Sequence, residues 1–353
     1  MKMAYNSDFD EYKLLGEPDK VEKAEIWQTA IGLQQVDGLT PSEYLIETAK
    51  QNIEGEITFY EVQERLNGYY KLKPIQNDDD RTEEADKVSA RIAEILSEKT
   101  FSFSPVEYIT IHKRLFIGIY KFAGKIRDYN ISKGEWVLNG KTVYYASADS
   151  IRATLDYDFE QEKAFHYKGL SKEQIVAHIA KFVSGIWQIH AFGEGNTRTT
   201  AVFAIKYLRT FGYTVTNNLF ADHSWYFRNA LVRANYNDYN NNIFSTYEYL
   251  DNFFGNLLLG ESTALKNRDL HVFALTEIDV PVNVPEKDKN VPVKRKDEIV
   301  KRLLDNPNLT AGELAAIFSV TDRTIKRDFT ALKNENKIKR VGSDKVGHWE
   351  VIQ

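Results

Sequence analysis

The 353-residue sequence contains no cysteine, so disulfide bonds, thiolate metal sites and a cysteine nucleophile are all excluded. It also has no apolar run long enough to cross a bilayer, and its first ten residues are polar and acidic. The absence of cysteine fits a reducing compartment, the absence of an apolar run gives no membrane segment, and we therefore expect a cytoplasmic location with no membrane partner. The net charge of −5 argues against a chain that is coated with nucleic acid throughout.

The charge is uneven along the chain, which indicates more than one domain. Residues 291–353 hold 13 Lys and Arg against 9 Asp and Glu, a local balance of +4 within the total of −5. Pro281, Pro285 and Pro292 interrupt an irregular stretch at the start of this basic end. The sequence therefore predicts an N-terminal helical segment over 1–80, a main domain over 81–260, a linker over 261–292 and a small domain over 293–353.

Helical periodicity dominates the main domain. Ser171 and Gln174 form a capping-box pattern ahead of an apolar stripe that runs to Ile189, which predicts a core helix over 171–190. A second helical pattern starts near Thr197 and stops at Gly212. The loop that joins these helices and opens the second one reads His190-Ala191-Phe192-Gly193-Glu194-Gly195-Asn196-Thr197-Arg198.

This 190–198 loop has the residue types of an anion site. A helix start leaves backbone N–H groups without partners and carries partial positive charge, so a glycine-containing loop can wrap a phosphate there. Gly193, Gly195 and Asn196 suit that wrap, and Arg198 can add a bidentate grip on phosphate oxygens. The pattern therefore favours a phosphate-bearing ligand at the start of the second helix.

Two further side chains of the loop suggest catalysis. Glu194 would repel a phosphate unless a divalent cation lay between them, which makes it a candidate Mg²⁺ ligand. His190 is placed to take a proton from an incoming hydroxyl. Taken singly, a histidine at a helix end is also a common dipole partner, and Gly-Glu-Gly-Asn is also an ordinary turn. The combination in this order favours the functional interpretation.

The stretch resembles the core motif of the Fic family, His-Pro-Phe-x-(Asp/Glu)-Gly-Asn-(Gly/Lys)-Arg-x-x-Arg. The segments 119–127, 130–134 and 226–239 are similar to the family's as well, so the resemblance extends over about residues 85–255. It implies a mainly α fold with a Fic helical-bundle core. Trp136 to Tyr145, with Asn139-Gly140 at the turn, predicts the β-hairpin flap of such a core.

The resemblance implies a protein adenylyltransferase, which moves AMP from ATP to a hydroxyl of a target protein or of itself. His190 would be the base and Glu194 would hold Mg²⁺. The flap would dock an extended target strand. The residues expected to contact the nucleotide are Gly193, Gly195, Asn196, Thr197, Arg198, Asn235 and Tyr236, and those expected to dock the target are Trp136, Val137, Leu138 and Tyr144.

Three positions depart from the family motif: Ala191, Thr197 and Ala201. The arginine that Ala201 replaces grips the distal phosphates in the family and is the partner of an inhibitory glutamate. Segment 23–58 resembles an antitoxin-like module that offers two candidate regulatory acids, Asp37 and Glu54. Asp37 is one methylene shorter than glutamate, and its expected partner would be Ala201, so we expect this inhibition to be weak or absent. Both acids also fit simple helix ends before glycines.

The basic end resembles a winged helix-turn-helix. Residues 296–304, 310–318 and 322–332 predict three helices, and 338–351 predict two strands. The same fold also serves as a dimerisation module, and a homodimer is a further expectation. The alternative function is therefore a DNA-binding transcriptional regulator with a nucleotide-sensing or inactive Fic core. Its expected DNA contacts are Arg323, Thr324, Lys326 and Arg327.

Overall fold

The computed structural model describes residues 9–72, 81–213, 215, 219–273, 296, 299–304, 306–318, 322–335, 337–341 and 348–352. The chain divides into two compact units, Met1–Pro285 and Glu286–Gln353. The first unit contains both the N-terminal segment and the main domain, which the sequence analysis had separated at residue 80. The predicted linker begins inside this unit, and its residues 274–292 lie outside the described part of the chain.

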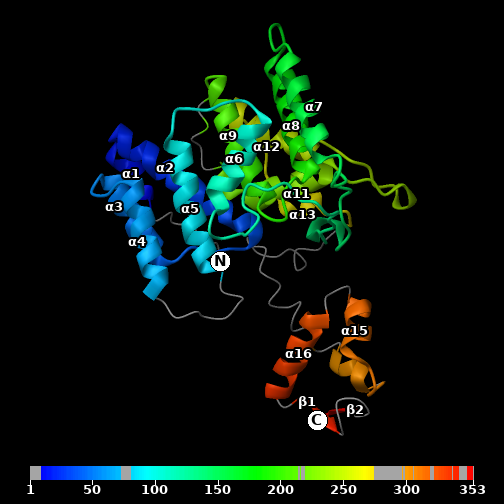
Figure 1. Cartoon of the computed structure of the whole chain (residues 1–353). Coiled ribbons are helices and arrows are strands. Elements are labelled where there is room, and N and C mark those ends of the chain that lie inside the picture. Colours follow the sequence, from blue (N-terminus) through cyan, green and yellow to red (C-terminus); the bar gives the residue numbers. More distant parts are fainter. Residues whose placement is uncertain are drawn as a thin grey trace. The chain divides into compact units, whose positions relative to one another are not determined.

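The first unit is a bundle of α-helices with short 3-10 turns between them, as the sequence predicts (Figure 1). Its first half contains α1 (Asp10–Leu15), α2 (Pro18–Gly32), η1 (Leu33–Asp37), α3 (Glu43–Glu54), α4 (Phe59–Leu72), α5 (Thr82–Ser97), α6 (Pro105–Phe116) and η2 (Trp136–Leu138). Its second half contains α7 (Ile151–Ala164), α8 (Lys172–Ile189), α9 (Asn196–Thr210), α10 (Leu219–Asp222), α11 (Ser224–Ala234), η3 (Tyr239–Asn241), α12 (Glu248–Leu259) and α13 (Asn267–Leu270). Among the described residues, no helix combines the length and apolar composition that crossing a membrane requires.

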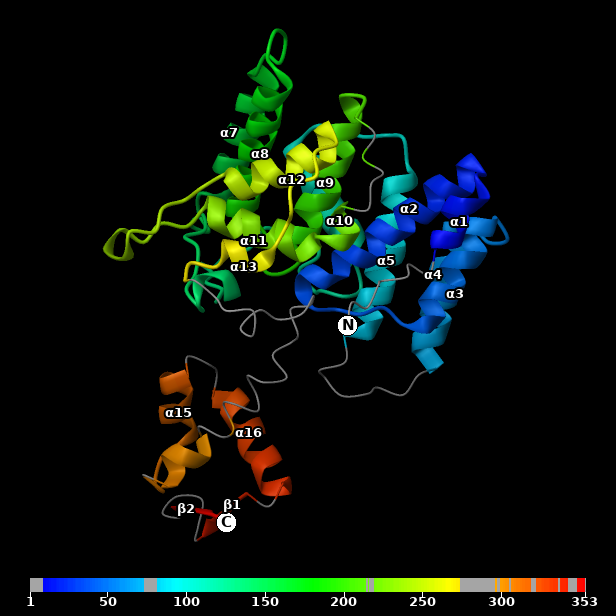
Figure 2. The ribbon, with the colours of Figure 1, turned by 180° about the vertical axis from the view of Figure 1, so that it is seen from behind.

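Helix α8 leads the chain into the 190–198 loop. The predicted capping box is present, because Gln174 N–H donates to the Ser171 hydroxyl and Ser171 N–H donates to the Gln174 amide oxygen. Helix α8 packs against α7, α9 and α12, and Figure 2 shows α12 beside α8. The helix that ends at the site is thus fixed at its start by a cap and along its length by the core.

The N-terminal helices are built into the same core as the rest of the unit. One cluster of buried apolar side chains extends from Phe9 in the first residues described to Leu270 in α13. Helix α2 packs against α5 and α10, and Gly32 at its end lies so close to α10 that a Cβ there would be 2.3 Å from the Cα of Ala221. Segment η1, which follows Gly32, is therefore held tightly against the main bundle.

Residues 135–145 contain the predicted turn but not the predicted strands. Asn139 and Gly140 both have positive φ, at 55° and 82°, and Gly140 N–H donates to the carbonyl of Glu135 at 2.9 Å. Ahead of the turn, however, η2 buries the successive residues Val137 and Leu138 completely. A strand sends successive side chains to opposite faces, so burial of both favours a wound backbone. The hairpin prediction is wrong for the described residues of this flap, which form no β-ladder.

The second unit has the predicted helices and strands. Residues 299–304 are helical, and they are followed by α15 (Ala311–Phe318), α16 (Asp322–Asn334), β1 (Ile338–Val341) and β2 (His348–Val351). The strands pair antiparallel, with Ile338 opposite Val351. A small core of its own includes Leu314, Ile325 and Trp349. Of the expected DNA contacts, Lys326 is exposed on α16, and the side chains of Arg323, Thr324 and Arg327 lie outside the described residues.

Candidate functional site

The backbone of the 190–198 loop is fixed by two residues in the left-handed region. His190 ends α8 with φ 50° and ψ 56°, and Gly195 precedes α9 with φ 78°. A Cβ on Gly195 would lie 2.3 Å from the ring of Phe116, so this position accepts glycine alone. Arg127 holds the strained turn, because its Nε donates to the carbonyl of His190 at 2.7 Å. The loop geometry is therefore set before any ligand arrives.

Gly195→Ala is expected to destabilise the loop without removing any functional group. The alanine would meet both the left-handed backbone penalty and the ring of Phe116, and we expect a loss of about 2–4 kcal/mol in the free energy of unfolding. Denaturant unfolding measures it. Gly55→Ala is the matched control, because Gly55 also has positive φ, at 81°, but has no atom within 4 Å of its Cβ position. Equal losses in the two variants would contradict the role of the Phe116 contact.

Side chains of the loop tie it to itself and to its neighbours. The Asn196 side-chain amide accepts from Phe192 N–H at 3.0 Å and donates to the Phe192 carbonyl at 2.7 Å. The Thr197 hydroxyl accepts from the indole N–H of Trp187 at 3.0 Å. The ring of Phe192 is fully buried, as expected of a core anchor. The side chains of Asn196 and Thr197 thus stabilise the loop. These two residues can still contact a nucleotide through their backbone N–H groups at the start of α9.

A second histidine, His112 of α6, contacts the loop and holds it in place. Its ring stacks on Phe192 with centroids 3.7 Å apart, its Nδ1 accepts from Gly124 N–H at 2.9 Å, and its Nε2 lies 3.0 Å from the Glu194 carbonyl. This pattern requires the neutral ring with the proton on Nε2. Burial lowers the pKa of His112 to about 4, although the bond to Glu194 opposes the shift.

The neutral state of His112 makes stability depend on pH. The folded pKa lies below the ordinary value of 6.5, so the unfolded chain binds the proton more tightly, and stability is lost as pH falls from 6.5 towards 4. We expect this group to account for up to about 3 kcal/mol over that range. Unfolding free energies of wild type and His112→Gln, measured at several pH values, should differ in slope there. An unchanged slope would contradict the prediction, and exposed His166→Gln is the control.

His190 is buried beside the loop that it opens. Its side chain is 3% exposed, its ring lies 4.1 Å from that of Tyr145, and Trp187 packs perpendicular to it. Neither ring nitrogen has a hydrogen-bond partner among the described residues. Burial lowers the pKa of His190 well below its ordinary value, and the charges of Lys133 and Arg228 act in the same direction. The ring is therefore neutral near pH 7, as a proton acceptor must be.

Glu194 is the carboxylate of the loop, and it is paired with a lysine of the segment just before the flap. Lys133 Nζ lies 2.8 Å from Glu194 Oε2, and the carboxylate is 47% exposed. Within the described ranges there is no group of three or more His, Asp or Glu side chains that could hold a metal ion. One accessible carboxylate still fits Mg²⁺, which in phosphate-binding sites takes one or two protein carboxylates and obtains its other ligands from phosphates and water.

Arg198, expected to grip phosphate, is already engaged by residues of η1 and α5. It is fully buried, with Nε 2.8 Å from Asp37 Oδ2 and Nη2 2.7 Å from Glu84 Oε1. Its Nη1 donates to the side-chain oxygen of Gln34 at 2.9 Å, and the guanidinium lies over the ring of Phe116. The arginine must exchange at least one of these partners before it can hold a phosphate.

Asp37 has arginine partners, contrary to the expectation drawn from Ala201. Its carboxylate bridges Arg198 and Arg228, whose Nη1 lies 3.6 Å from Asp37 Oδ1. Burial acts to raise the pKa of Asp37, but the two arginines hold it below its ordinary value. The second candidate acid, Glu54, instead pairs with Lys20 at 2.7 Å at the end of α3. Of the two acids, Asp37 is the one that the fold brings to the 190–198 loop.

Arg228, on α11, is a site residue that the sequence analysis missed. Its Nη2 lies 3.0 Å from Glu135 Oε2 of the flap, and its Nη1 donates to the carbonyl of Val36 at 2.8 Å. Glu84, Lys133 and Arg127 were missed in the same way. Arg127, Lys133 and Arg228 do lie in the segments 119–127, 130–134 and 226–239 that resemble the family's, but no local pattern indicates their contacts, because each one reaches the loop from a distant part of the sequence.

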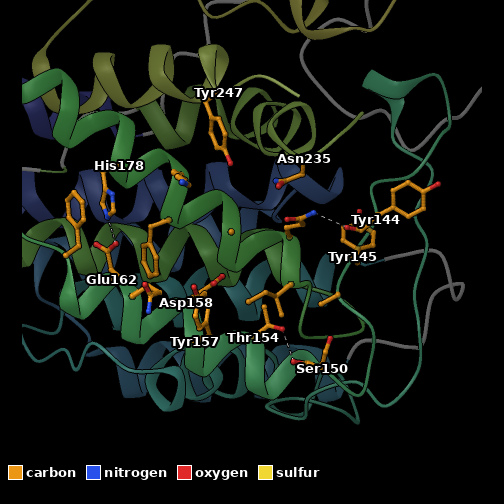
Figure 3. Close-up of a pocket in the computed structure, with 18 residues that line it drawn as sticks. Tyr144, Tyr145, Ser150, Thr154, Tyr157, Asp158, Glu162, His178, Asn235 and Tyr247 are labelled. Atoms are coloured by element: carbon orange, nitrogen blue, oxygen red, sulfur yellow. Dashed lines mark hydrogen bonds and ion pairs between the residues drawn. The ribbon is translucent and has the colours of Figure 1, made fainter. Parts of the chain in front are cut away.

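A cavity of about 850 Å³ lies beside the site, along α7 and α8 (Figure 3). Tyr144 and Tyr145 line one end of it, and Asn235 and Tyr247 line the side opposite α7. The amide of Asn235 donates to the Ser184 hydroxyl at 2.8 Å, whereas the neighbouring Tyr236 is buried with its hydroxyl 3.3 Å from Asp238. The fold thus brings Asn235 to the cavity wall.

The four residues expected to dock a target differ in exposure. The side chains of Val137 and Leu138 are fully buried, so their docking of a target stays a prediction for the backbone alone. Trp136 packs on Trp225 with ring centroids 4.8 Å apart. Tyr144 is 82% exposed and is available for docking at the mouth of the cavity.

Comparisons with known proteins match two separate parts of the chain. Residues 102–208 match the Fic/DOC family, and residues 295–342 match the DeoR-like helix-turn-helix domain. The Protein adenylyltransferase VbhT of Bartonella schoenbuchensis is 26% identical over 188 residues, which make up 52% of this chain and 36% of that protein. The protein named "Probable protein adenylyltransferase y4lH" of Sinorhizobium fredii is 29% identical over 141 residues, 40% of this chain and 69% of that protein.

A solved structure is also similar. The BepC protein of Bartonella tribocorum, with bound AMPPNP, is 18% identical, and the match has a TM-score of 0.37 over 56% of this chain and 86% of that chain. The chain spans about a third of the length of the first curated relative and about two thirds of the second.

Proposed function

We propose that this chain, whose residues 102–208 form a Fic/DOC domain, is a protein adenylyltransferase that moves AMP from ATP to a protein hydroxyl. One observation carries the proposal: a buried, neutral His190 directly precedes a glycine loop that opens a helix. The base and the anion site are then within one short loop, as transfer of a phosphorus group to a hydroxyl requires. The names of the two curated relatives support the same activity.

In the proposed reaction, His190 accepts the proton of the target hydroxyl as its oxygen bonds to the α-phosphorus of ATP. The bond from that phosphorus to the bridging oxygen breaks, and pyrophosphate leaves. The backbone N–H groups at the start of α9 and the side chain of Arg198 would hold phosphate oxygens. Mg²⁺ would be held by Glu194 and would supply charge neutralisation to the phosphates, for which Lys133 must leave the carboxylate.

We further propose that Asp37 restrains this reaction. Its carboxylate holds Arg198 at 2.8 Å, at the guanidinium that the phosphates need. A negatively charged group in this place competes with the nucleotide for the same donors. The N-terminal helices thereby act as a built-in inhibitor.

Labelled ATP tests the reaction directly. With Mg²⁺ and a mixture of candidate proteins, α-labelled ATP should label a protein, and γ-labelled ATP should not, because pyrophosphate carries the γ-phosphate away. Label from the γ position alone would show phosphotransfer instead. Absence of label from both, under conditions in which the chain binds ATP, would reject the enzyme proposal.

Target docking is expected to depend on Tyr144. This side chain is 82% exposed at the mouth of the cavity, and exposed aromatic residues often carry much of the energy of an interface. Tyr144→Ala should raise the KM for the target protein about tenfold and leave the affinity for ATP unchanged. Steady-state labelling at varied target concentration measures it, with exposed Tyr60→Ala as the control on α4. Equal effects of the two variants would contradict docking at Tyr144.

The helix-turn-helix match favours a second function for the other unit. The DeoR-like domain over residues 295–342 supports DNA binding, which would make the chain a regulator as well as an enzyme. A salt-dependent gel shift tests this function. It should survive His190→Ala and fail in Arg323→Ala, whereas a shift that survives both would argue against the expected recognition helix.

A further inference from the structure

Two arginines from different helices converge on one carboxylate in the core of the first unit. Arg198 comes from the first turn of α9 and Arg228 from the middle of α11, and both pair with Asp37, at 2.8 and 3.6 Å. Asp37 directs one oxygen to each guanidinium. A phosphate group can bridge two guanidinium groups in the same way, because its oxygens accept from both.

Charge balance supports the exchange of this carboxylate for another anion. Arg198 keeps Glu84 as a partner at 2.7 Å, and Arg228 keeps Glu135 at 3.0 Å, when Asp37 is set aside. Each arginine would then have one carboxylate instead of two, in a buried place where unbalanced charge is costly. A phosphate that enters restores the second partner of both.

The position of Asp37 in its segment lets a phosphate replace its carboxylate without displacing the rest of the segment. It is the last residue of η1 and is followed by Gly38, which has φ 67° and turns the chain. Its side chain is 17% exposed, whereas Arg198 is fully buried. The carboxylate is therefore placed to turn towards solvent while η1 stays packed, which would leave Arg198 Nε and Arg228 Nη1 without the carboxylate that they share.

We propose that Arg228 is a phosphate-binding residue of the nucleotide site, and that Asp37 occupies the place of the phosphate that Arg198 and Arg228 share. Arg228 thus supplies from α11 the second arginine that α9 lacks, since Ala201 in α9 is fully buried and carries no charge. The inference rests on the proposed function in taking ATP as the ligand. It assigns the ability to select a polyphosphate to a residue outside the 102–208 match.

Nucleotide affinity tests the assignment without depending on transfer. The full chain with Asp37→Asn is compared with the same chain that also carries Arg228→Met, and the Kd of each is measured for AMPPNP and for adenosine with Mg²⁺ present. We expect Arg228→Met to weaken AMPPNP at least about tenfold and to leave adenosine unchanged. Arg233→Met is the matched control, because it removes another arginine of α11 whose guanidinium instead lies over the ring of Tyr249.

Two further measurements keep the result unambiguous. Thermal melting shows whether Arg228→Met folds; if it does not, Arg228→Lys is used, and it should weaken AMPPNP by about threefold or more through loss of the forked contact. Equal weakening of AMPPNP and adenosine, or no weakening of either, overturns the assignment. If Asp37→Asn binds AMPPNP with the expected dependence on Arg228 but labels no protein, the adenylyltransferase proposal fails and the assignment stands. If Asp37→Asn transfers AMP but its binding of AMPPNP does not depend on Arg228, the assignment of Arg228 fails and the adenylyltransferase proposal stands.

Discussion

Replacing His190 with alanine is expected to lower AMP transfer about a thousandfold while nucleotide binding is retained. A positioned general base contributes about a hundred- to ten-thousandfold to proton-transfer steps. His190, a neutral imidazole at the start of the loop, is the residue that we propose for this role. Its ring nitrogens make no hydrogen bond within the described part of the chain, so the loss should fall on chemistry more than on structure. Single-turnover labelling from α-labelled ATP measures the rate, and AMPPNP binding measures the retained site.

The control for this variant is His166→Ala, which removes an exposed histidine. The dependence of the transfer rate on pH below 7 is a second test. Because the pKa of His190 is lowered well below 6.5, transfer should stay high through pH 6 and fall only at lower pH. A His190→Ala enzyme that keeps more than about a tenth of the wild-type rate would contradict the assignment of the base.

Asp37→Asn is expected to raise AMP transfer at limiting ATP about a hundredfold. The substitution keeps the size of the side chain and removes the charge that holds Arg198 and Arg228, so phosphate no longer competes with a carboxylate for these donors. The same change leaves the buried Arg198 and the partly buried Arg228 with one carboxylate each. The variant should therefore melt at a lower temperature than wild type without ligand, and ATP should raise its Tm by more.

Glu54→Gln is the matched control for this gain. Glu54 also ends a helix before a glycine, but its partner is Lys20 in the N-terminal helices. Its loss should leave transfer unchanged. Equal activation by the two substitutions would mean that general loosening of the N-terminal helices, and not the charge of Asp37, releases the site. Unchanged transfer in Asp37→Asn would mean that Asp37 has a structural role alone.

The sequence predicted well those parts of the site that are written within a few residues of one another. Ser171 and Gln174 fixed the start of α8, and the glycines around Glu194 marked its end and the start of α9. His190 was predicted to be the base because base, carboxylate and anion loop are contiguous, and that role stays a prediction. Each of these signals is local, and local signals survive folding when the core helices on both sides are long.

Long-range partners could not be predicted in this way. Nothing near Asp37 in the sequence indicates that its carboxylate meets Arg228, which is 191 positions later in the chain. The rule that pointed to Ala201 gave the wrong partner because it assumed that both arginines of the site come from one helix. The prediction of a β-hairpin in the flap was wrong for a related reason. Asn139-Gly140 fixes a turn but does not decide whether Val137 and Leu138 pair with a strand or enter the core.

The close contact of Gly32 with Ala221 has a consequence for how such an enzyme can be switched. An inhibitor that binds as a separate piece can be removed by proteolysis, by dilution or by a competing partner. Here the helix that leads to Asp37 interlocks with α10 and shares its apolar core with the rest of the unit. In the proposed inhibition, the segment that carries Asp37 and the rest of the unit fold together, so we expect release to come from rearrangement within the intact fold and not from removal of that segment.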